Sequence, residues 1–505
     1  MKLTKNNLVK VANELKLSYS ILRRLTNMRP EITLGDDACF YDIETKDNKF
    51  MLGVVNDKVF YDAEEMLDYM KGFKVCCGFN NYRYDNEILF KDFPKYFKTV
   101  NFGNFVLHKI KGLINIDLLA VFMLWRPFKP SHKLNELAKE LGFQRKHESG
   151  EFDENKCRED VEIMKRFYPV AKELLNWTEK NFFLDPETLC SLYTRDLSKL
   201  RRWMLQSFML QKGIYPKLVR IEDKRKPSFF HFHRKGFFQN IYVYDVSSAY
   251  PTTAIRLNCS IWKKGDFAEY EKFLIEERKK NPAIEQYIKW LANAAIGDMN
   301  YTDGLLYNKK ILCDVWLTFK KVMEDWAEKV GKENIVYSYV DCLFTKKQIN
   351  VFPEGYNVRL KRIFDWLIIY NQIRYVGFSE GQIHKIHFNR KIDIKLYDYL
   401  DNMIEEKLKT NPLEFVKDPS LEALGIELKN LPKHLFKIVV KKTNNVCRSA
   451  EYLEIWDSLK EGLNDVYLSK NGITTDENKI CYQKYKRYID SYLKLFKFSS
   501  NLEKK

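Results

Sequence analysis

Three short segments of this sequence set acidic residues among apolar ones, and they constrain the fold more than any other feature. The segments are FYDIET (40–45), IYVYDV (241–246) and YSYVDCLF (337–344), and each shows the alternation typical of a β-strand. An ionised carboxylate is costly to bury on a mostly apolar strand unless a partner pairs with it or it binds a metal. The sequence therefore predicts β-strands whose acidic side chains pair with a partner group or bind a metal ion.

The length and composition indicate a protein with several packed domains. A chain of 505 residues exceeds one ordinary core, so we expect two to four domains. Its ten cysteines include no CxxC pair and no Cys/His cluster, which predicts reduced thiols in a cytosolic protein. The start MKLTKNNLVK has no signal-peptide core, and the longest apolar run (116–125) is half a membrane span. We therefore expect a soluble protein.

The net charge of +17 is unevenly distributed along the chain. Residues 1–200 carry 32 Lys and Arg against 30 Asp and Glu, whereas residues 201–505 carry 53 against 38. Basic groups in the second part, such as KRK (224–226) and ERKK (277–280), lie close to aromatic residues in the sequence. This pattern predicts a surface for a polyanion such as DNA. The alternative is a solvated Lys-rich face.

The predicted elements indicate a multidomain α+β protein. Residues 1–30 have the pattern of a basic helix, and strands and helices mix between about 39 and 200, as in a compact α/β unit. A basic helical block follows at 268–296, and beyond about 400 the chain is mainly helical. Further strands are predicted at NIYVYDV (240–246), ILCDVWL (311–317) and NIVYSYVDCLFT (334–345).

The acids of the first half fall in three separate segments. Asp42 and Glu44 are two residues apart on a predicted strand, so both side chains leave the same face. Two carboxylates on one face repel unless divalent cations lie between them, as in two-metal phosphodiester chemistry. GFNNYRYDNEI then places Asn81 and Asp85 at the opening of a helix, and CREDVEIMKRFY places Asp160 near the start of another. Taken singly, each helical acid is explained by the helix dipole.

Taken in order, the three segments resemble the exonuclease motifs of proofreading 3′–5′ exonucleases with a ribonuclease-H-like fold. That family has D-x-E first, N-x-x-x-D second and an Asp on a helix third. The resemblance implies that Asp42, Glu44, Asp85 and Asp160 are catalytic, with Asp85 the one not assigned to metal. It also implies that Asn81 positions the DNA end.

One position departs from this family. Four residues before its last Asp the family has Tyr or His, which orients the attacking water, whereas this chain has Lys156. Lysine is able to hold a water or a phosphate, and Lys146 or His147 are alternatives for the role. Asp117 lies on a strand that the family also has, without an assigned role.

The second half contains another ordered set of motifs. IYVYDVSSAYPTT places Asp245 at the end of an apolar strand and Tyr250 five residues later, where an aromatic ring suits the floor of a sugar pocket. KWLANAAIG places Lys289 and Asn293 one helical turn apart on one face. Such a lysine is suited to the oxygens of a triphosphate.

Asp245, Lys289 and Asp341, in this order, resemble motifs A, B and C of family B DNA polymerases. Those patterns run D-x-x-S-L-Y-P, K-x-x-x-N-S-x-Y-G and Y-x-D-T-D-S. The resemblance implies that Asp245 and Asp341 are catalytic and hold two Mg²⁺ ions, with Mn²⁺ as a substitute. It also implies that Lys289, Asn293 and Tyr250 bind the nucleotide, with Tyr250 as the steric gate against ribose.

These motifs also contain departures. Tyr339 stands where the first acid of motif C normally lies, and Ala249 replaces Leu in motif A. In motif B, Ala294 replaces Ser and Ile296 replaces the Tyr that stacks on the nucleotide. KLY (395–397) matches the K-x-Y motif that grips primer DNA, but an amphipathic strand is the favoured interpretation.

HRKGFF (233–238) resembles the segment that links exonuclease and polymerase in protein-primed members, and only 44 residues separate Asp245 from Lys289. The fold predicted from the resemblance is a ribonuclease-H-like exonuclease followed by a right-hand polymerase. Its parts are an N-terminal helical segment (1–33), the 3′–5′ exonuclease domain (34–200), palm (201–258), short fingers (259–300), palm again (301–390) and a helical thumb (391–505).

The function implied is that of a compact phage-type DNA polymerase with proofreading. Its partners would be a DNA primer–template and dNTPs, with a terminal protein primer as an open alternative. The protein would act as a monomer in the cytoplasm of a host cell, without membrane contact. Two other functions stay open: an active exonuclease with a degenerate, DNA-binding polymerase half, and a non-catalytic replication scaffold.

Overall fold

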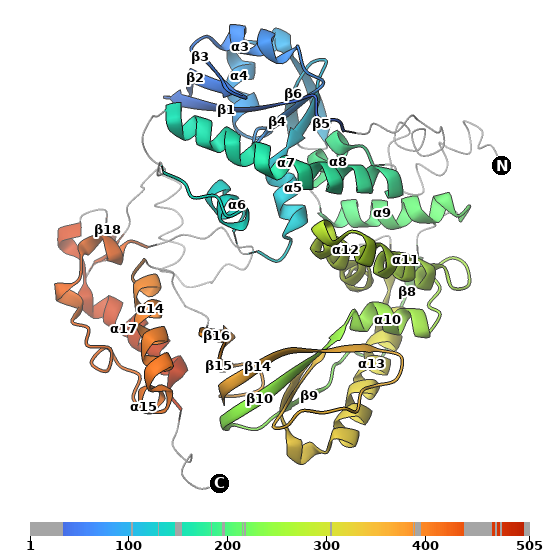
Figure 1. Ribbon diagram of the computed structural model, residues 1–505, viewed down its shortest axis with the longest axis vertical. Helices are drawn as coiled ribbons and strands as arrows, with labels where there is room; N and C mark the ends of the chain where they lie inside the picture. The colour runs from blue at the N-terminus through green and yellow to red at the C-terminus, as the bar shows by residue number, and fades with distance from the viewer. Residues whose placement is uncertain are drawn as a thin grey trace. The chain divides into compact units, whose positions relative to one another are not determined.

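The computed structural model divides into two compact units (Figure 1). Unit 1 comprises Met1–Ser228 and Ser248–Phe319, and unit 2 comprises Phe229–Ser247 and Lys320–Lys505. The predicted helical segment 1–33 and His147 lie outside the described residues. The residues described are 34–102, 105–129, 131–146, 154–182, 184–193, 197–214, 216, 219–302, 306–386, 388, 395–438, 467–469, 472–474 and 477–498.

Unit 1 is built on a five-stranded sheet with the order β3-β2-β1-β4-β7. The first three strands form an antiparallel meander, and β4 and β7 then add in parallel to β1. The strands are β1 (Ala38–Lys46), β2 (Lys49–Val55), β3 (Lys58–Phe60), β4 (Val75–Gly78) and β7 (Ile114–Asp117).

Alternation along β1 assigns the two faces of this sheet. Phe40 packs edge-on against Tyr168 of α7 (Glu154–Phe182), with ring centroids 5.1 Å apart. Tyr41 belongs instead to the core under α3 (Ala63–Met70) and α4 (Asp85–Asp92). Because side chains two residues apart share a face, Asp42 and Glu44 lie on the α7 side. Figure 1 shows α7 along this sheet.

The rest of unit 1 is mainly helical, and one apolar core runs from the sheet through these helices. Two small pairs complete the unit: β5 (Phe97–Phe102) with β6 (Phe105–Ile110), and β8 (Val219–Ile221) with β11 (Leu306–Asn308). The helices are α5 (Leu118–Trp125), α6 (Leu134–Glu140), α8 (Pro186–Tyr193), α9 (Leu197–Gln211), α10 (Ala249–Arg256), α11 (Asp266–Lys280) and α12 (Glu285–Asp298).

Unit 2 contains a seven-stranded antiparallel sheet with the order β16-β15-β14-β10-β13-β12-β9. The long strand β10 lies between β13 and β14 and is therefore central. The strands are β9 (His231–His233), β10 (Gly236–Ser247), β12 (Ile335–Tyr339), β13 (Cys342–Thr345), β14 (Asn357–Ile369), β15 (Tyr375–Ser379) and β16 (Gln382–Ile386).

The C-terminal elements of unit 2 share a core with β14 and β15. Trp366 and Ile368 of β14 are buried in it together with residues of all three helices. The elements are α14 (Lys395–Thr410), α15 (Pro412–Lys417), α17 (Tyr482–Leu493) and the hairpin of β17 (Tyr467–Ser469) and β18 (Gly472–Thr474). No helix within the described part of the chain is long and apolar enough to cross a membrane.

Two predicted strands are helices in the structure. Residues 311–317 lie in the helix α13 (Lys309–Val330), because Ile311, Val315 and Phe319 are buried at helical spacing. The short window with its β-branched residues hid this longer period. Residues 395–397 begin α14 instead of forming a strand, and the ring of Tyr397 is buried against Tyr492.

Candidate active sites

Four predicted acids of unit 1 come together beside its sheet. Asp42 and Glu44 project from β1, Asp85 is the first residue of α4, and Asp160 lies near the start of α7. Loss of water and the charge of Asp160 raise the pKa of Asp42 to about 8. Burial and the charge of Asp42 raise the pKa of Asp85 well above its usual range. These four carboxylates, which we call the unit 1 cluster, repel one another and favour a cation.

Two basic side chains contact the unit 1 cluster. The Nζ of Lys156 lies 2.6 Å from Oε1 of Glu44, and Arg145 donates a hydrogen bond to Asp160. Burial raises the pKa of Asp160 to about 6, against the opposing effect of Arg145. Lys156 and Arg145 therefore partly neutralise the carboxylates that the sequence predicted as metal ligands. The backbone N–H of Lys146 donates a hydrogen bond to Oε1 of Glu159.

Asn81, four residues before Asp85 in the sequence, is fully buried. Its side-chain amide donates to the hydroxyl of Tyr41 at 3.0 Å and to the carbonyl of Ile116 at 3.3 Å. A Cβ on Gly78 would lie 2.7 Å from that of Asn81, so a glycine is required for the close approach. In the structure Asn81 fixes the turn that leads to Asp85.

Asp117 has a structural explanation that the sequence did not supply. Its carboxylate accepts hydrogen bonds from the backbone N–H of Leu119 at 3.0 Å and of Asn80 at 2.9 Å. It thus caps α5 and ties β7 to the turn before Asp85. Burial raises its pKa to about 6.

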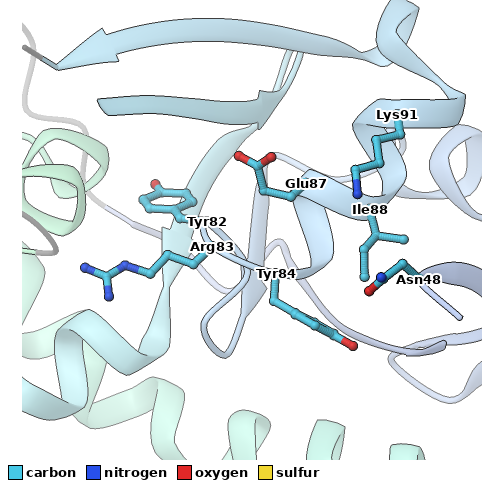
Figure 2. Close-up of a pocket in the computed structure, with 7 residues that line it drawn as sticks. All are labelled: Asn48, Tyr82, Arg83, Tyr84, Glu87, Ile88 and Lys91. Atoms are coloured by element: carbon cyan, nitrogen blue, oxygen red, sulfur yellow. The ribbon is translucent and has the colours of Figure 1, made fainter. Parts of the chain in front are cut away.

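A pocket of about 350 Å³ is lined by Tyr84 and by residues of α4, and sequence reasoning missed it. Tyr84 is 45% exposed, and its hydroxyl shares a hydrogen bond with the hydroxyl of Thr45 at 2.9 Å. The only signal in the sequence was the Tyr-Arg-Tyr run between Asn81 and Asp85. Figure 2 labels its lining residues Asn48, Tyr82, Arg83, Tyr84, Glu87, Ile88 and Lys91.

A second group of acids lies in unit 2. Asp245 of β10, Asp341 and Cys342 each offer a donor atom, and the three atoms lie within 4.8 Å of one another. Asp245 is directly opposite Cys342 in the antiparallel pair of β10 and β13. Burial and the charge of Asp245 raise the pKa of Asp341. These three residues, called here the unit 2 cluster, have the oxygen ligands that Mg²⁺ prefers, with one sulfur added.

The strand predicted around Asp341 is a hairpin instead. Val340 and Asp341 form a two-residue turn between β12 and β13, and the φ of Val340 is +59°. A β-branched residue rarely adopts this conformation, so no turn was predicted at this position. Asp341 therefore projects from a turn, and its carbonyl accepts the N–H of Val246 at 2.9 Å.

Basic residues also flank the unit 2 cluster. Arg359 and Lys361 of β14 each lie 3.4 Å from a carboxylate oxygen of Asp245. Both of these side chains are about half exposed, at 52% and 48%. Tyr339 pairs with Cys342 across β12 and β13 and packs edge-on against Phe229 at 5.2 Å. Asp245, Cys342 and Tyr339 are therefore neighbours across the three adjacent strands β10, β13 and β12.

The predicted nucleotide-binding residues belong to unit 1. Lys289 and Asn293 lie one turn apart on α12, and both are partly exposed. Ile296 is buried in the unit 1 core, so this position offers no ring to a nucleotide. The ring of Tyr250 stacks on Trp316 at 4.7 Å, with Phe319 edge-on at 5.4 Å.

The structure is similar to the family B DNA polymerase from the hyperthermophilic archaeon Pyrobaculum calidifontis, with a TM-score of 0.59 and 15% sequence identity. The match covers 93% of this chain and 78% of that chain. This chain has the fold of a family B DNA polymerase. The coarse part of the prediction, a family B polymerase fold, is thereby confirmed, whereas the ribonuclease-H-like exonuclease and the palm, fingers and thumb stay predictions. No protein-family model and no curated protein sequence matches the chain.

Proposed function

We propose that this protein is a DNA-directed DNA polymerase with a 3′–5′ exonuclease activity. The observation that supports it best is the meeting of Asp245 and Asp341 in a chain with this fold. The two residues are 96 positions apart in the sequence, and the structure brings their carboxylates within 4.8 Å. Convergence of this kind is what two-metal phosphoryl transfer requires.

The polymerase centre would work as follows. Asp245 and Asp341 would hold two Mg²⁺ ions, or Mn²⁺ in their place. When bound, these ions supply Lewis acidity and neutralise charge on the attacking and leaving oxygens. Lys289 binds the triphosphate, Asn293 assists on the same helical face, and Tyr250 excludes a 2′-hydroxyl. The stacking of Tyr250 on Trp316 supports this role because it fixes the ring.

The exonuclease centre would use the unit 1 cluster. Asp42, Glu44 and Asp160 would hold the metal ions, Asp85 would complete the acidic site, and Asn81 would position the DNA end through the turn that it holds. The strand order and directions of unit 1 support a ribonuclease-H-like domain. The pocket at Tyr84 suits a base of the single strand, with Arg83 and Lys91 for its phosphates.

The finer assignments follow from this proposal. They are an exonuclease domain at 34–200, palm segments at 201–258 and 301–390, short fingers at 259–300 and a thumb at 391–505. Compact size and the HRKGFF segment favour a phage-type enzyme, with a terminal protein as one way of priming. The protein would then act as a monomer on primer–template DNA in the cytoplasm of a host cell.

A second candidate is an exonuclease whose polymerase half only binds DNA. Tyr339 in place of an acid and the buried Ile296 favour it. A labelled DNA hairpin with a recessed 3′ end separates the candidates when incubated with Mg²⁺, with and without dNTPs. We expect extension with dNTPs and digestion without them. Digestion under both conditions would support the second candidate, and a mobility shift without turnover would support a scaffold.

A further inference from the structure

The unit 2 cluster differs from a pair of carboxylates because a thiol is part of it. The donor atoms of Asp245, Asp341 and Cys342 all lie within 4.8 Å of one another. The Sγ of Cys342 lies 3.6 Å from Oδ1 of Asp341, to which the thiol donates. No other cysteine within the described residues contributes to such a group.

The backbone aims all three donors at one place. Cys342 and Asp245 are directly opposite each other in the β10–β13 pair, so their side chains leave the same face of the sheet. The turn at Val340 then brings Asp341 back over this face, and its carbonyl is tied to β10 through Val246. The thiol position is therefore set by strand register and not by a mobile loop.

The spacing suits a soft cation. Zinc-type ions bind sulfur at about 2.3 Å and oxygen at about 2.0–2.2 Å in a tetrahedron, which places two donors about 3.5 Å apart. The 3.6 Å between the sulfur of Cys342 and Oδ1 of Asp341 agrees with this value. Three protein donors with a fourth position open is also the number found in catalytic zinc sites.

Exposure supports the same interpretation. Cys342 is half-buried, whereas the other described cysteines are buried. At the level of whole residues, Cys342 is therefore more exposed than a buried cysteine such as Cys313. Lys361 and Arg359 lie near Asp245 but are about half exposed, so they are free to swing into solvent when a cation arrives.

We infer that Cys342 makes the unit 2 cluster a mixed oxygen–sulfur site that binds thiophilic divalent cations, such as Cd²⁺ and Zn²⁺, through a metal–sulfur bond. The inference rests on the proposed function, since the same carboxylates would hold the catalytic ions. On binding, the S–H bond breaks, the sulfur electron pair forms the bond to the metal, and the proton passes to the buffer. No electron is transferred. Such ions would occupy the site in place of Mg²⁺ and stop nucleotide addition.

The test is a Cd²⁺ titration of the full chain without Mg²⁺, followed by the ultraviolet charge-transfer band of a cadmium–thiolate bond. We expect a saturable band in the wild-type protein and in Cys313→Ser, which replaces a buried thiol elsewhere. In Cys342→Ser the band should be lost. In Asp341→Asn the dissociation constant for Cd²⁺ should rise at least tenfold. An unchanged band in Cys342→Ser, or unchanged affinity in Asp341→Asn, would overturn the inference.

Alkylation gives a second readout that does not depend on a spectroscopic band. Iodoacetamide should modify Cys342 faster than the buried cysteines, and Cd²⁺ should slow this modification at least tenfold, as measured by peptide mass spectrometry. Equal modification of Cys342 with and without Cd²⁺ would contradict a metal–sulfur bond.

Primer extension in Mg²⁺ on the same preparations separates this inference from the proposed function. A protein that extends primers but shows no Cys342-dependent cadmium band retains the proposed function and loses the inference. A protein with the band but without extension keeps the metal site and loses the polymerase assignment. Cd²⁺ should inhibit extension by the wild-type protein at concentrations that saturate the band, and inhibition unrelated to band formation would count against the inference.

Discussion

The two acidic clusters of this protein differ in how the chain itself balances their charge. In the unit 1 cluster, Lys156 lies 2.6 Å from Glu44, and Arg145 is hydrogen-bonded to Asp160. In the unit 2 cluster, the nearest basic groups lie 3.4 Å from Asp245 and are about half exposed. Ion pairs held inside a site compete with metal ions, whereas exposed side chains move away at little cost. For the metal sites proposed above, the comparison predicts that the unit 2 cluster binds its ions more readily than the unit 1 cluster.

The largest expected effect comes from removing one acid of the unit 2 cluster. Asp341→Asn should lower the rate of dNTP incorporation by about 10³-fold or more, because one ligand of the paired metals is lost. Digestion of single-stranded 3′ ends should persist, since the unit 1 cluster is intact. Primer extension on a labelled hairpin measures both activities. Asp365→Asn, at an exposed position on β14, is the matched control. A folded Asp341→Asn protein that still extends primers would remove Asp341 from the site.

The next effect concerns the sugar. Tyr250→Ala should raise ribonucleotide incorporation relative to dNTP incorporation by about 10- to 100-fold, because the ring that excludes the 2′-hydroxyl is gone. Tyr250→Phe keeps the ring stacked on Trp316 and should retain the discrimination. Single-nucleotide incorporation with matched rNTP and dNTP gives the ratio. An unchanged ratio in Tyr250→Ala would place the steric gate elsewhere.

The ion pair of Lys156 sharpens the comparison directly. Lys156→Met should lower the Mg²⁺ concentration needed for half-maximal degradation by about 3- to 10-fold, because Glu44 no longer has a competing cation. Lys165→Met is the control, since Lys165 lies on the same helix and pairs with Asp57 at 2.6 Å. If Lys156→Met instead abolishes degradation at saturating Mg²⁺, the lysine acts in the chemistry and does not merely oppose the metal.

A smaller effect is expected on stability. The pKa of Asp42 is raised from 3.8 to about 8 in the folded protein, so the folded state binds more protons than the unfolded state between these values. Stability of the metal-free protein should therefore fall as the pH rises through this window. Asp42→Asn should melt about 2 °C or more above wild type at pH 8 with EDTA, and at the same temperature near pH 4. If Asp42→Asn and the wild-type protein melted at the same temperature at pH 8 as well as near pH 4, the raised pKa of Asp42 would be contradicted.

The sequence predicted which acids lie near one another better than which neighbours hold them. The order of the motifs correctly predicted that four acids lie near one another: Asp42, Glu44, Asp85 and Asp160. This was possible because strand alternation and helix starts are local features. The pairing of Arg145 with Asp160 was not predictable, since Arg145 lies in an irregular segment outside any motif. Amphipathic periodicity also predicted α12 correctly, with Lys289 and Asn293 on one face.

The predictions that failed also have physical causes, because each depended on residues outside the short segment that was read. The turn at Val340 requires a positive φ, which the pairing of β12 with β13 imposes on an unfavourable residue, so local propensity predicted an unbroken strand. At 311–317 the helical period was visible only over the whole of α13. Cys342 was passed over because its importance depends on the residue across the sheet.

The most direct test of two separate centres uses the variant Asp42→Ala with Glu44→Ala, which should lose about 10³-fold or more of its Mg²⁺-dependent degradation. Without digestion, incorporation can be measured on four hairpins that differ only in the templating base. The account predicts that this variant adds only the complementary dNTP to each hairpin, at a rate close to that of wild type. Loss of incorporation in the folded variant, or incorporation that ignores the template, would contradict it.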